Sequence, residues 1–418
     1  MIQDLYGQFE SVKLKNGLTI YALQMAVPWQ RMSFMVHSGG VQDPAGKEGT
    51  AHFVEHLISH NALIPCDALE DYFNEKGGGV MLGATGYWYT EYRFFIPAED
   101  AVLTRSLEYF SNMLLHEVLE QRIELERNVI VNEYNKKYPL ASKYELMMHT
   151  HQTLFGGMLV GRCLDRLGTP ATIAAITQAD LQEFYDTHYT PQNMSIVGVG
   201  AYSLEQLVEF FSKSHFGDHK TGDRTVFEPT IAFPPLAMNR KDVCISDYMG
   251  LNNPAVNGAY ESHLRLPIIL KQNALEIFCR MVKDELDTIV RQEKGWTYAI
   301  NASYGHYIQF YHLHIECASL AVAGLECIEE IVNTVILTLG EKEDLFNKAK
   351  QNKLANAIMN DENGLGILKE ASSNILCHGD IISIASYVAA IEQVQFSDVL
   401  AVGSYWKPEN IFTVLTRP

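Results

Sequence analysis

The sequence predicts an α+β fold made of two similar halves, and three observations lead to that prediction. Short sequence matches recur at a spacing of about half the 418-residue chain. Strand-like and helix-like patterns alternate within each half, and a stretch rich in proline and glycine separates the halves. We therefore expect each half to be a sheet covered by helices.

The repeat rests on three matches that share one offset. Glu-Lys-Gly at 75–77 recurs at 293–295, which is an offset of 218 residues. Residues 176–181 match 394–399 at an offset of 218, and residues 189–193 match 406–410 at an offset of 217. Three coincidences at one spacing indicate a tandem duplication.

The boundary between the two copies falls in a stretch with the composition of a linker. Polar residues there are interrupted by Gly217, Gly222, Pro229, Pro234 and Pro235. The sequence therefore predicts an N-terminal domain over 1–217, a linker over 218–235 and a homologous C-terminal domain over 236–418.

Local patterns predict the main elements of both halves in order. Apolar residues alternate on both sides of Asn16-Gly17, which predicts a β-hairpin with a type I′ turn. Aromatic and β-branched residues predict strands over 87–96 and 304–315. Apolar residues at helical spacing predict helices over 101–115, 120–138 and 274–290.

Charge and composition exclude several classes of partner. The chain has 50 acidic and 32 basic residues, and its net charge of −18 would repel both a nucleic-acid backbone and an anionic membrane surface. With 47% hydrophobic and 20% charged residues, the chain is of ordinary globular composition. We expect neither nucleic acid nor a membrane among its partners.

Cysteine usage and the N-terminal sequence predict a cytoplasmic protein. The seven cysteines form no C-x-x-C pair, which argues against a disulfide framework and against a thiolate zinc site. The first residues lack the basic and apolar regions of a signal peptide, and no apolar run has the length of a membrane span.

The strongest chemical motif is H-x-x-E-H at 52–56, the inverted form of the zinc-protease helix motif. On a helix, His52 and His56 lie one turn apart on the same face, so two imidazole nitrogens could bind one ion. The carboxylate of Glu55 lies beside them and could accept a proton from the water that attacks an amide.

A catalytic zinc site needs a third protein ligand, and the segment 126–133 offers one. Glu126 and Glu133 are two helical turns apart, so both carboxylates lie on one helix face, with Val129 and Ile130 as apolar neighbours. His60 follows His56 by one turn and spacing alone would permit it as a ligand, but we favour a surface or loop histidine there.

The sequence resembles the pitrilysin, or insulinase-like, zinc metallopeptidase family, which includes mitochondrial processing peptidase, and looks like its short single-chain bacterial type. That family's signature is H-x-x-E-H, about seventy residues, then two glutamates seven apart. Here 69 residues separate His56 from Glu126, and six separate Glu126 from Glu133. The resemblance implies that His52, His56 and Glu133 bind one zinc ion per chain, that Glu55 is the general base, and that Glu126 orients the site.

The family's architecture implies two tandem homologous α/β-roll domains that form a clamshell. In the second half, the positions equivalent to the three ligands hold Leu270, Ala274 and Gln351, so no zinc site can form at those positions. This half instead carries Arg291 and Tyr298, similar to a family pair that faces the zinc across a closed chamber. The resemblance implies that Arg291 holds the substrate backbone and that Tyr298 hydrogen-bonds the developing oxyanion.

One departure concerns the strand that pairs with substrate. The family usually has Asn-Ala there, whereas this chain has Leu82-Gly83, which leaves the register of the substrate open.

The function predicted is a metalloendopeptidase that hydrolyses short or unfolded peptides, by adding them to a sheet edge inside a closed chamber. Family members of this length usually pair, so we expect a homodimer, with a heterodimer of related subunits as the alternative. Two other functions stay open: a maturation protease for a ribosomal peptide precursor that works with a related partner subunit, and a non-catalytic scaffold subunit.

Overall fold

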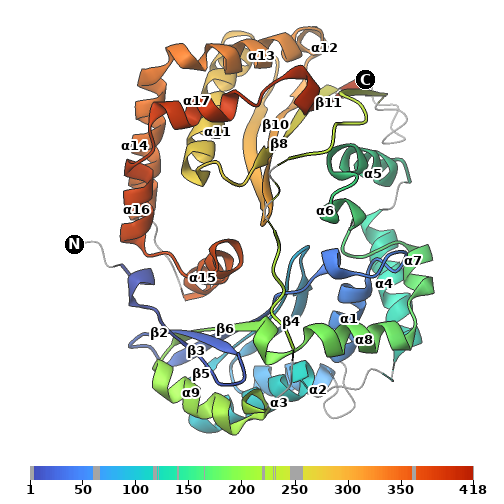
Figure 1. The fold of residues 1–418 in the computed structure, drawn as a ribbon, viewed down its shortest axis with the longest axis vertical. Coiled ribbons are helices and arrows are strands. Elements are labelled where there is room, and N and C mark those ends of the chain that lie inside the picture. The colour runs from blue at the N-terminus through green and yellow to red at the C-terminus, as the bar shows by residue number, and fades with distance from the viewer. Residues whose placement is uncertain are drawn as a thin grey trace. The chain divides into compact units, whose positions relative to one another are not determined.

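A computed structural model of the chain describes residues 4–59, 66–115, 120, 122–138, 141–163, 165–218, 222–228, 230, 232–244, 258–359 and 364–417. The α+β class is confirmed, because two mixed sheets form and helices pack against each (Figure 1). The chain divides into two compact units. Unit 1 comprises 1–137, 162–226 and 361–384, and unit 2 comprises 138–161, 227–360 and 385–418.

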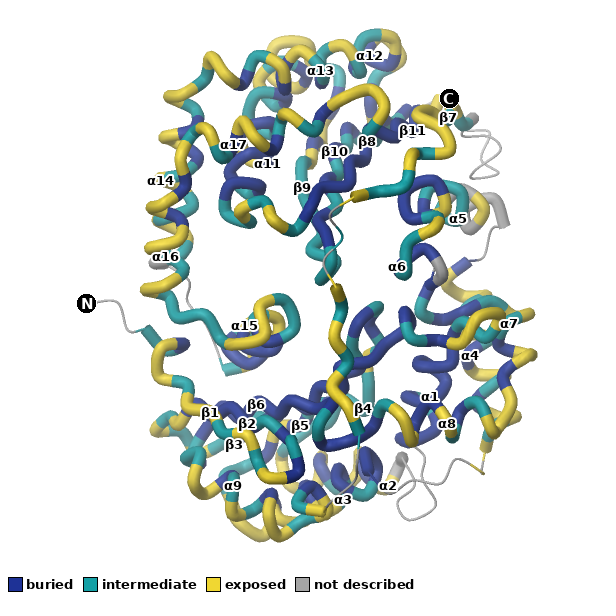
Figure 2. Tube along the Cα trace, in the orientation of Figure 1, coloured by how far each residue is buried: buried dark blue, intermediate teal, exposed yellow. Residues whose placement is uncertain are grey.

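The sheet of unit 1 has the strand order β1-β2-β6-β3-β5-β4, so β4 is an edge strand. Strands β2 and β6 pair in parallel, and the other neighbouring strands pair antiparallel. Every residue of β6 is buried, as expected for a central strand that is covered on both faces (Figure 2). The strands are β1 (Glu10–Lys13), β2 (Thr19–Gln24), β3 (Trp29–Val36), β4 (Gly79–Thr85), β5 (Thr90–Pro97) and β6 (Met194–Gly200).

Helices cover both faces of this sheet. On one face the ring of Phe34 lies 4.8 Å from that of Phe110 and 5.5 Å from that of Phe216, at the centre of the larger core. The opposite face packs against α15 through Ile367 and Leu368. The helices of unit 1 include α1 (Thr50–Ile58), α2 (Cys66–Glu75), α3 (Asp100–Leu115), α4 (Ile123–Lys137), α7 (Pro170–Ala175), α8 (Gln178–His188), α9 (Leu204–Lys213) and α15 (Gly364–His378).

The sheet of unit 2 has the order β7-β11-β8-β10-β9. Only its β7–β11 pairing is parallel among the described strands of this sheet. The strands are β7 (Arg240–Cys244), β8 (Gly258–Pro267), β9 (Ala299–Tyr307), β10 (Phe310–Leu320) and β11 (Ile411–Arg417). The remaining helices are α5 (Ala141–Phe155), α6 (Leu159–Arg162), α11 (Gln272–Leu286), α12 (Val322–Leu325), α13 (Ile328–Thr338), α14 (Glu343–Met359), α16 (Ile384–Glu392) and α17 (Phe396–Gly403).

The two units differ from the domains expected at 1–217, 218–235 and 236–418. The chain passes from unit 1 to unit 2 at Val226, within the expected linker, but α5 belongs to unit 2 and α15 belongs to unit 1. The physical reason is burial, because α15 covers a sheet face of unit 1 that would otherwise expose Met35 and Val197. Where the duplication itself begins and ends stays a prediction.

The first hairpin forms, but its turn differs from the expected type. Strands β1 and β2 pair antiparallel, and the backbone N–H groups of Leu14 and Gly17 donate to the carbonyls of Leu18 and Leu14 respectively. This is a three-residue loop with Gly17 at φ +91°, the geometry of a type I turn followed by a bulge. The backbone of Asn16 does not adopt the left-handed conformation that a type I′ turn requires. Its side chain is buried, and the side-chain amide donates a hydrogen bond to the carbonyl of Phe216.

The other expected elements are largely confirmed, with one correction. The helices expected over 101–115, 120–138 and 274–290 correspond to α3, α4 and α11, and the strand expected over 87–96 corresponds to β5. The strand expected over 304–315 is instead the hairpin of β9 and β10, whose turn contains no glycine or proline to mark it. None of the described helices combines the length and apolarity that crossing a bilayer would need.

Candidate metal centre

Helix α1 is fixed at its N-terminus by a buried carboxylate. Asp43 accepts hydrogen bonds from the backbone N–H groups of Gly49 and Ala51, both at 2.7 Å, so donors that lack helical partners are satisfied. Gly49 immediately precedes the helix and has a φ of +102°, where a side chain would be strained. The apolar residues Phe53 and Val54 are fully buried, which holds the helix against the sheet.

Two histidines of α1 and one glutamate of α4 converge in unit 1. Glu133 Oε2 lies 3.7 Å from His52 Nε2 and 3.7 Å from His56 Nε2. The two imidazole rings lie edge to face with centroids 4.6 Å apart. One donor atom from each of the three residues lies within 4.8 Å of the others. Two imidazoles and a carboxylate are a donor set that suits zinc, with a fourth position left open.

The donor atoms are oriented as a metal site requires. His56 Nδ1 lies 3.2 Å from Glu126 Oε2, and a hydrogen bond donated by Nδ1 would leave Nε2 as the ligand atom. Glu126 itself is buried and pairs with Arg122 at 3.5 Å. Burial lowers the pKa of His52 to about 3, so its ring is neutral near pH 7, the form that binds metals.

Glu55 is buried against β4. Its Oε2 accepts a hydrogen bond from Thr85 Oγ1 at 2.8 Å, and a Cβ atom at Gly83 would overlap its carboxylate. Burial raises the pKa of Glu55, while the neighbouring His56 and the Thr85 hydrogen bond lower it. A carboxylate with a raised pKa is a better proton acceptor than an exposed one.

The structure brings together His52, Glu55, His56, Glu126 and Glu133 around one site, and the roles that the resemblance implies for them stay predictions. Of the two apolar neighbours expected on α4, one is fully buried and the other, Val129, is 43% exposed.

Further residues of this site carried no such pattern in the sequence. Asp43 and Thr85 reach α1 through loop and strand geometry, and only their polar character could have marked them. Leu82 and Gly83 lie where the pairing of β4 with β5 shifts register, between Met81 and Ala84. His60 lies outside the described residues.

Arg291 and Tyr298 lie together in unit 2. The guanidinium of Arg291 is 5.4 Å from the centre of the Tyr298 ring, and it also pairs with Asp287 at 3.1 Å. Arg291 belongs to a π-helical turn, Asp287–Glu293, that continues α11. Tyr298 is 82% exposed, so its hydroxyl is available to a ligand.

Comparisons with known proteins identify the family. Residues 29–164 match the family model described as insulinase, peptidase family M16, and residues 175–353 match the model of the peptidase M16 inactive domain. The chain is 23% identical to the zinc protease PqqE of Helicobacter pylori, over all of this chain and 94% of that protein. It is also 27% identical to the probable mitochondrial-processing peptidase subunit beta of Arabidopsis thaliana, over 56% of this chain but only 43% of that protein.

Solved structures share the fold and correct one expectation. The periplasmic protease PqqL from Escherichia coli superposes with a TM-score of 0.81 at 17% identity, over all of this chain and 48% of PqqL. That neighbour is periplasmic, so the expected cytoplasmic location is wrong. The cysteine pattern misled us because buried thiols such as Cys279 and Cys317 do not depend on the redox state of the compartment. The matches to both M16 models, together with this shared fold, show that the chain belongs to the pitrilysin-like M16 family of peptidases.

Proposed function

We propose that this protein is a zinc-dependent endopeptidase that hydrolyses short or unfolded peptides in a closed chamber. The observation that carries the proposal is the convergence of His52, His56 and Glu133 beside the buried carboxylate of Glu55. Relatives that are named zinc proteases support the same activity. A zinc ion bound by these ligands would act as a Lewis acid on the scissile carbonyl and would lower the pKa of water.

The residues of the chain divide the remaining chemistry among them. Glu55 takes the proton of the attacking water and passes it to the leaving amine, while Thr85 holds the carboxylate in place. Glu126 keeps the ring of His56 in one orientation through Nδ1. The side chains of Glu55 and His52 are buried, so charge interactions at these two groups are stronger than in solvent. The side chain of Glu133 is 46% exposed and stays open to water.

Peptide substrates would bind along β4. Among the described strands it pairs with β5 alone, so its other edge can accept an extended peptide as an added strand. Main-chain hydrogen bonds of that kind do not depend on substrate sequence, which suits unfolded peptides. The pairing of β4 with β5 is irregular at Leu82 and Gly83. At this point a bound peptide would depart from regular pairing with β4.

We further propose that two chains share their sites, so that Arg291 and Tyr298 of one chain complete the zinc centre of the other. PqqL supports this arrangement, because this chain covers only 48% of it and one PqqL chain therefore has the length of about two copies. A homodimer is the simplest pairing. A heterodimer is the alternative, supported by relatives named as the beta subunit of a peptidase.

The test is digestion of a peptide library by the purified chain with and without a chelator, read by mass spectrometry. We expect Glu55→Gln to retain zinc and to lower turnover by about two orders of magnitude or more. Glu133→Gln should lose zinc from this site, whereas Glu124→Gln, an exposed glutamate of the same helix, should change neither property. Cleavage at full rate by Glu55→Gln with matched zinc content would contradict the proposal.

A further inference from the structure

A second cluster of metal-binding side chains lies in unit 2, on the sheet and not on a helix. It consists of Glu261 and His263 of β8 and His314 of β10. His314 is directly opposite His263 in the antiparallel pairing of these strands. Side chains two apart on a strand, and those directly opposite on a neighbour, share one face, so all three project to the same side.

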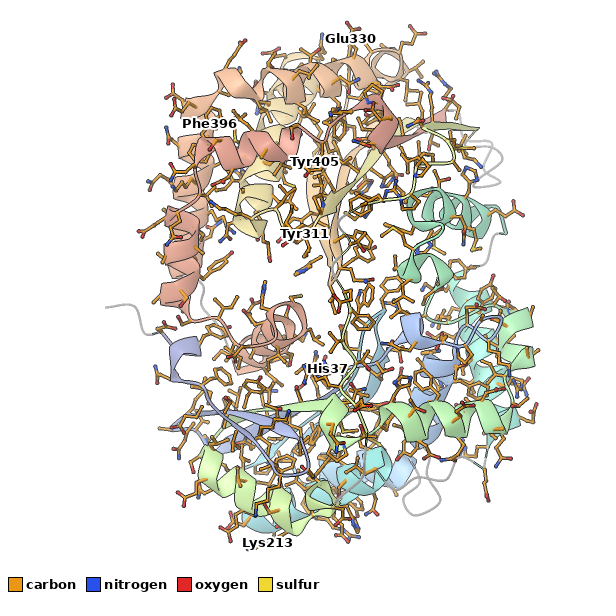
Figure 3. The ribbon with its side chains drawn as sticks, viewed as in Figure 1. His37, Lys213, Tyr311, Glu330, Phe396 and Tyr405 are labelled. Carbon is orange, nitrogen blue, oxygen red and sulfur yellow. The ribbon has the colours of Figure 1, made fainter. Side chains whose placement is uncertain are left out.

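That side is opposite to the helical core of unit 2. Tyr311 of β10, labelled in Figure 3, and Leu313 are buried in that core, so the alternating residues His312 and His314 face the other way. The ring of Phe155, from α5, lies 5.4 Å from that of His312 and partly covers this face. The cluster therefore lies on the face of β8 and β10 that is turned away from the helical core, and α5 packs against part of that face.

The distances between the donor atoms match those of a tetrahedral zinc site. Glu261 Oε2 lies 3.5 Å from His263 Nε2 and 3.4 Å from His314 Nε2. Two ligands that each lie at the usual distance from one tetrahedral zinc ion are about 3.4 Å apart. A direct hydrogen bond between these groups would be shorter, at about 2.7–3.2 Å.

His263 is oriented by a second imidazole. Its Nδ1 lies 3.2 Å from His312 Nε2, and this contact leaves Nε2 of His263 directed at the cluster. The His263 side chain is only 6% exposed, and its Nε2 has no hydrogen-bond partner among the described residues. The 3.5 Å contact with Glu261 is too long for a good hydrogen bond. A buried nitrogen without such a bond is costly, and a metal ion would satisfy it.

The cluster also offers a path for an ion to enter. The side chains of Glu261 and His314 are 36% and 26% exposed, so both can meet an ion from solvent before the buried His263 completes the site. The rings of His263 and His314 are stacked within 6° of parallel. Because the lone pair of each ring lies in its plane, binding one ion requires a tilt, which we expect at the more exposed His314.

We propose that Glu261, His263 and His314 form a second binding site for a divalent transition-metal ion, zinc by its donor set, which fastens β8 to β10. This site is independent of the proposed peptidase chemistry, since its residues belong to unit 2 and the ligands on α1 and α4 belong to unit 1. The prediction of one zinc ion per chain was based only on the ligands of α1 and α4. The second site escaped the sequence analysis because its ligands are 51 residues apart and become neighbours only through strand register.

The test is the zinc content of the full chain after dialysis against a fixed free zinc concentration, measured by elemental analysis. Four proteins decide it: the natural chain, a His52→Gln/His56→Gln variant, the same variant with Glu261→Gln, and the same variant with His314→Gln. His215→Gln in that background is the matched control, because His215 pairs with Asp218 at 2.8 Å but belongs to neither cluster. Melting temperatures with and without zinc give a readout that does not depend on activity.

We expect two zinc ions in the natural chain, one in the His52→Gln/His56→Gln variant, and at least tenfold weaker binding once Glu261 or His314 is replaced. The rise in melting temperature on adding zinc should survive His215→Gln and disappear with Glu261→Gln. If the His52→Gln/His56→Gln variant binds no zinc, the cluster is only a hydrogen-bonded group and the proposal is wrong. A retained ion in both the Glu261→Gln and His314→Gln proteins would place the metal elsewhere and also overturn it.

Discussion

The pKa of Glu55 is subject to opposing effects. Burial raises its pKa, whereas the neighbouring imidazole of His56 and the hydroxyl of Thr85 lower it. Its position depends on a strand residue without a side chain, Gly83, because any Cβ there would overlap the carboxylate. Gly83 is therefore a positioning residue for the proposed general base.

The first prediction concerns that glycine. Gly83→Ala should displace the carboxylate of Glu55 and lower kcat by about tenfold to a hundredfold, because small errors in the position of a catalytic group are costly. Zinc content should stay the same, since the three atoms nearest to the added methyl group all belong to Glu55, which is not a proposed ligand. Steady-state peptide cleavage and elemental analysis measure the two effects.

The control for this substitution is Gly340→Ala, in unit 2, where an added Cβ would have nothing within 4 Å. Both variants lower the backbone freedom of the unfolded chain in the same way. If Gly83→Ala retains the natural kcat, the Glu55 carboxylate tolerates displacement and its exact position is not limiting.

The helical part of the candidate site could be predicted from sequence, because the geometry of a helix is local. Residues four apart on a helix, such as His52 and His56, lie on the same face. Residues seven apart, such as Glu126 and Glu133, also share a face, because seven residues make about two turns. The contact between α1 and α4 came from the family resemblance and not from spacing. Thr85 could not be predicted as a partner of Glu55, since that hydrogen bond depends on how β4 packs against α1.

Strands β3 and β6 are joined by a buried polar contact just beyond the end of β3. His37 is labelled in Figure 3, and its Nε2 lies 2.8 Å from Ser195 Oγ. Arg224 Nη1 donates a hydrogen bond to the same hydroxyl at 3.3 Å. Burial, with a smaller contribution from Arg224, lowers the pKa of His37 to about 3. The ring is therefore neutral in the folded protein over most of the pH range.

The second prediction is acid sensitivity that comes from His37. Its pKa is lower in the folded state than the usual 6.5. The neutral ring therefore makes its full contribution to the free energy of unfolding above about pH 6.5, and this contribution is lost as the pH falls from there toward 3. Between pH 7 and pH 5 the loss should be about 2 kcal/mol. His37→Gln should unfold with a correspondingly weaker dependence on pH, as measured by denaturant titration at several pH values.

His188→Gln serves as a comparison for that experiment. Burial lowers the pKa of His188 to about 4, so its removal should reduce acid sensitivity in the same direction but by less. An unfolding curve of His37→Gln that shifts with pH as steeply as that of the natural chain would show that the His37 pKa is not lowered in the folded state.

Assembly into two units could be predicted only in part. Periodicity identified α3 and α11, because an apolar stripe reports that one face of a helix is buried. Helix α4 was identified too, although its buried residues are Glu126 and Ile130 and its apolar Val129 is exposed. It does not report which sheet the helix covers, so the membership of α5 in unit 2 and of α15 in unit 1 depends on packing that the sequence pattern does not encode. The cluster of Glu261, His263 and His314 could not be predicted for a different reason, because the register between β8 and β10 brings these residues together.

The proposed sharing of sites between chains makes Tyr298 a residue with a measurable role. Its exposed hydroxyl would hydrogen-bond the developing oxyanion of a substrate bound to another copy. Tyr298→Phe should therefore lower kcat by about tenfold to a thousandfold with zinc content and melting temperature unchanged. Leu337→Ala, another highly exposed position of unit 2, should leave kcat unaltered.

The last prediction tests whether that role is exercised between chains. Mixing Glu55→Gln chains with Tyr298→Phe chains under conditions of subunit exchange should restore activity, because one of the two sites in a mixed dimer receives an intact Glu55 and an intact Tyr298. The other site receives both lesions, so random mixing in equal amounts should recover about a quarter of the natural activity. Exchange itself is followed with differently labelled chains. Mixed dimers that form without any recovery would show that Tyr298 acts within its own chain or not at all.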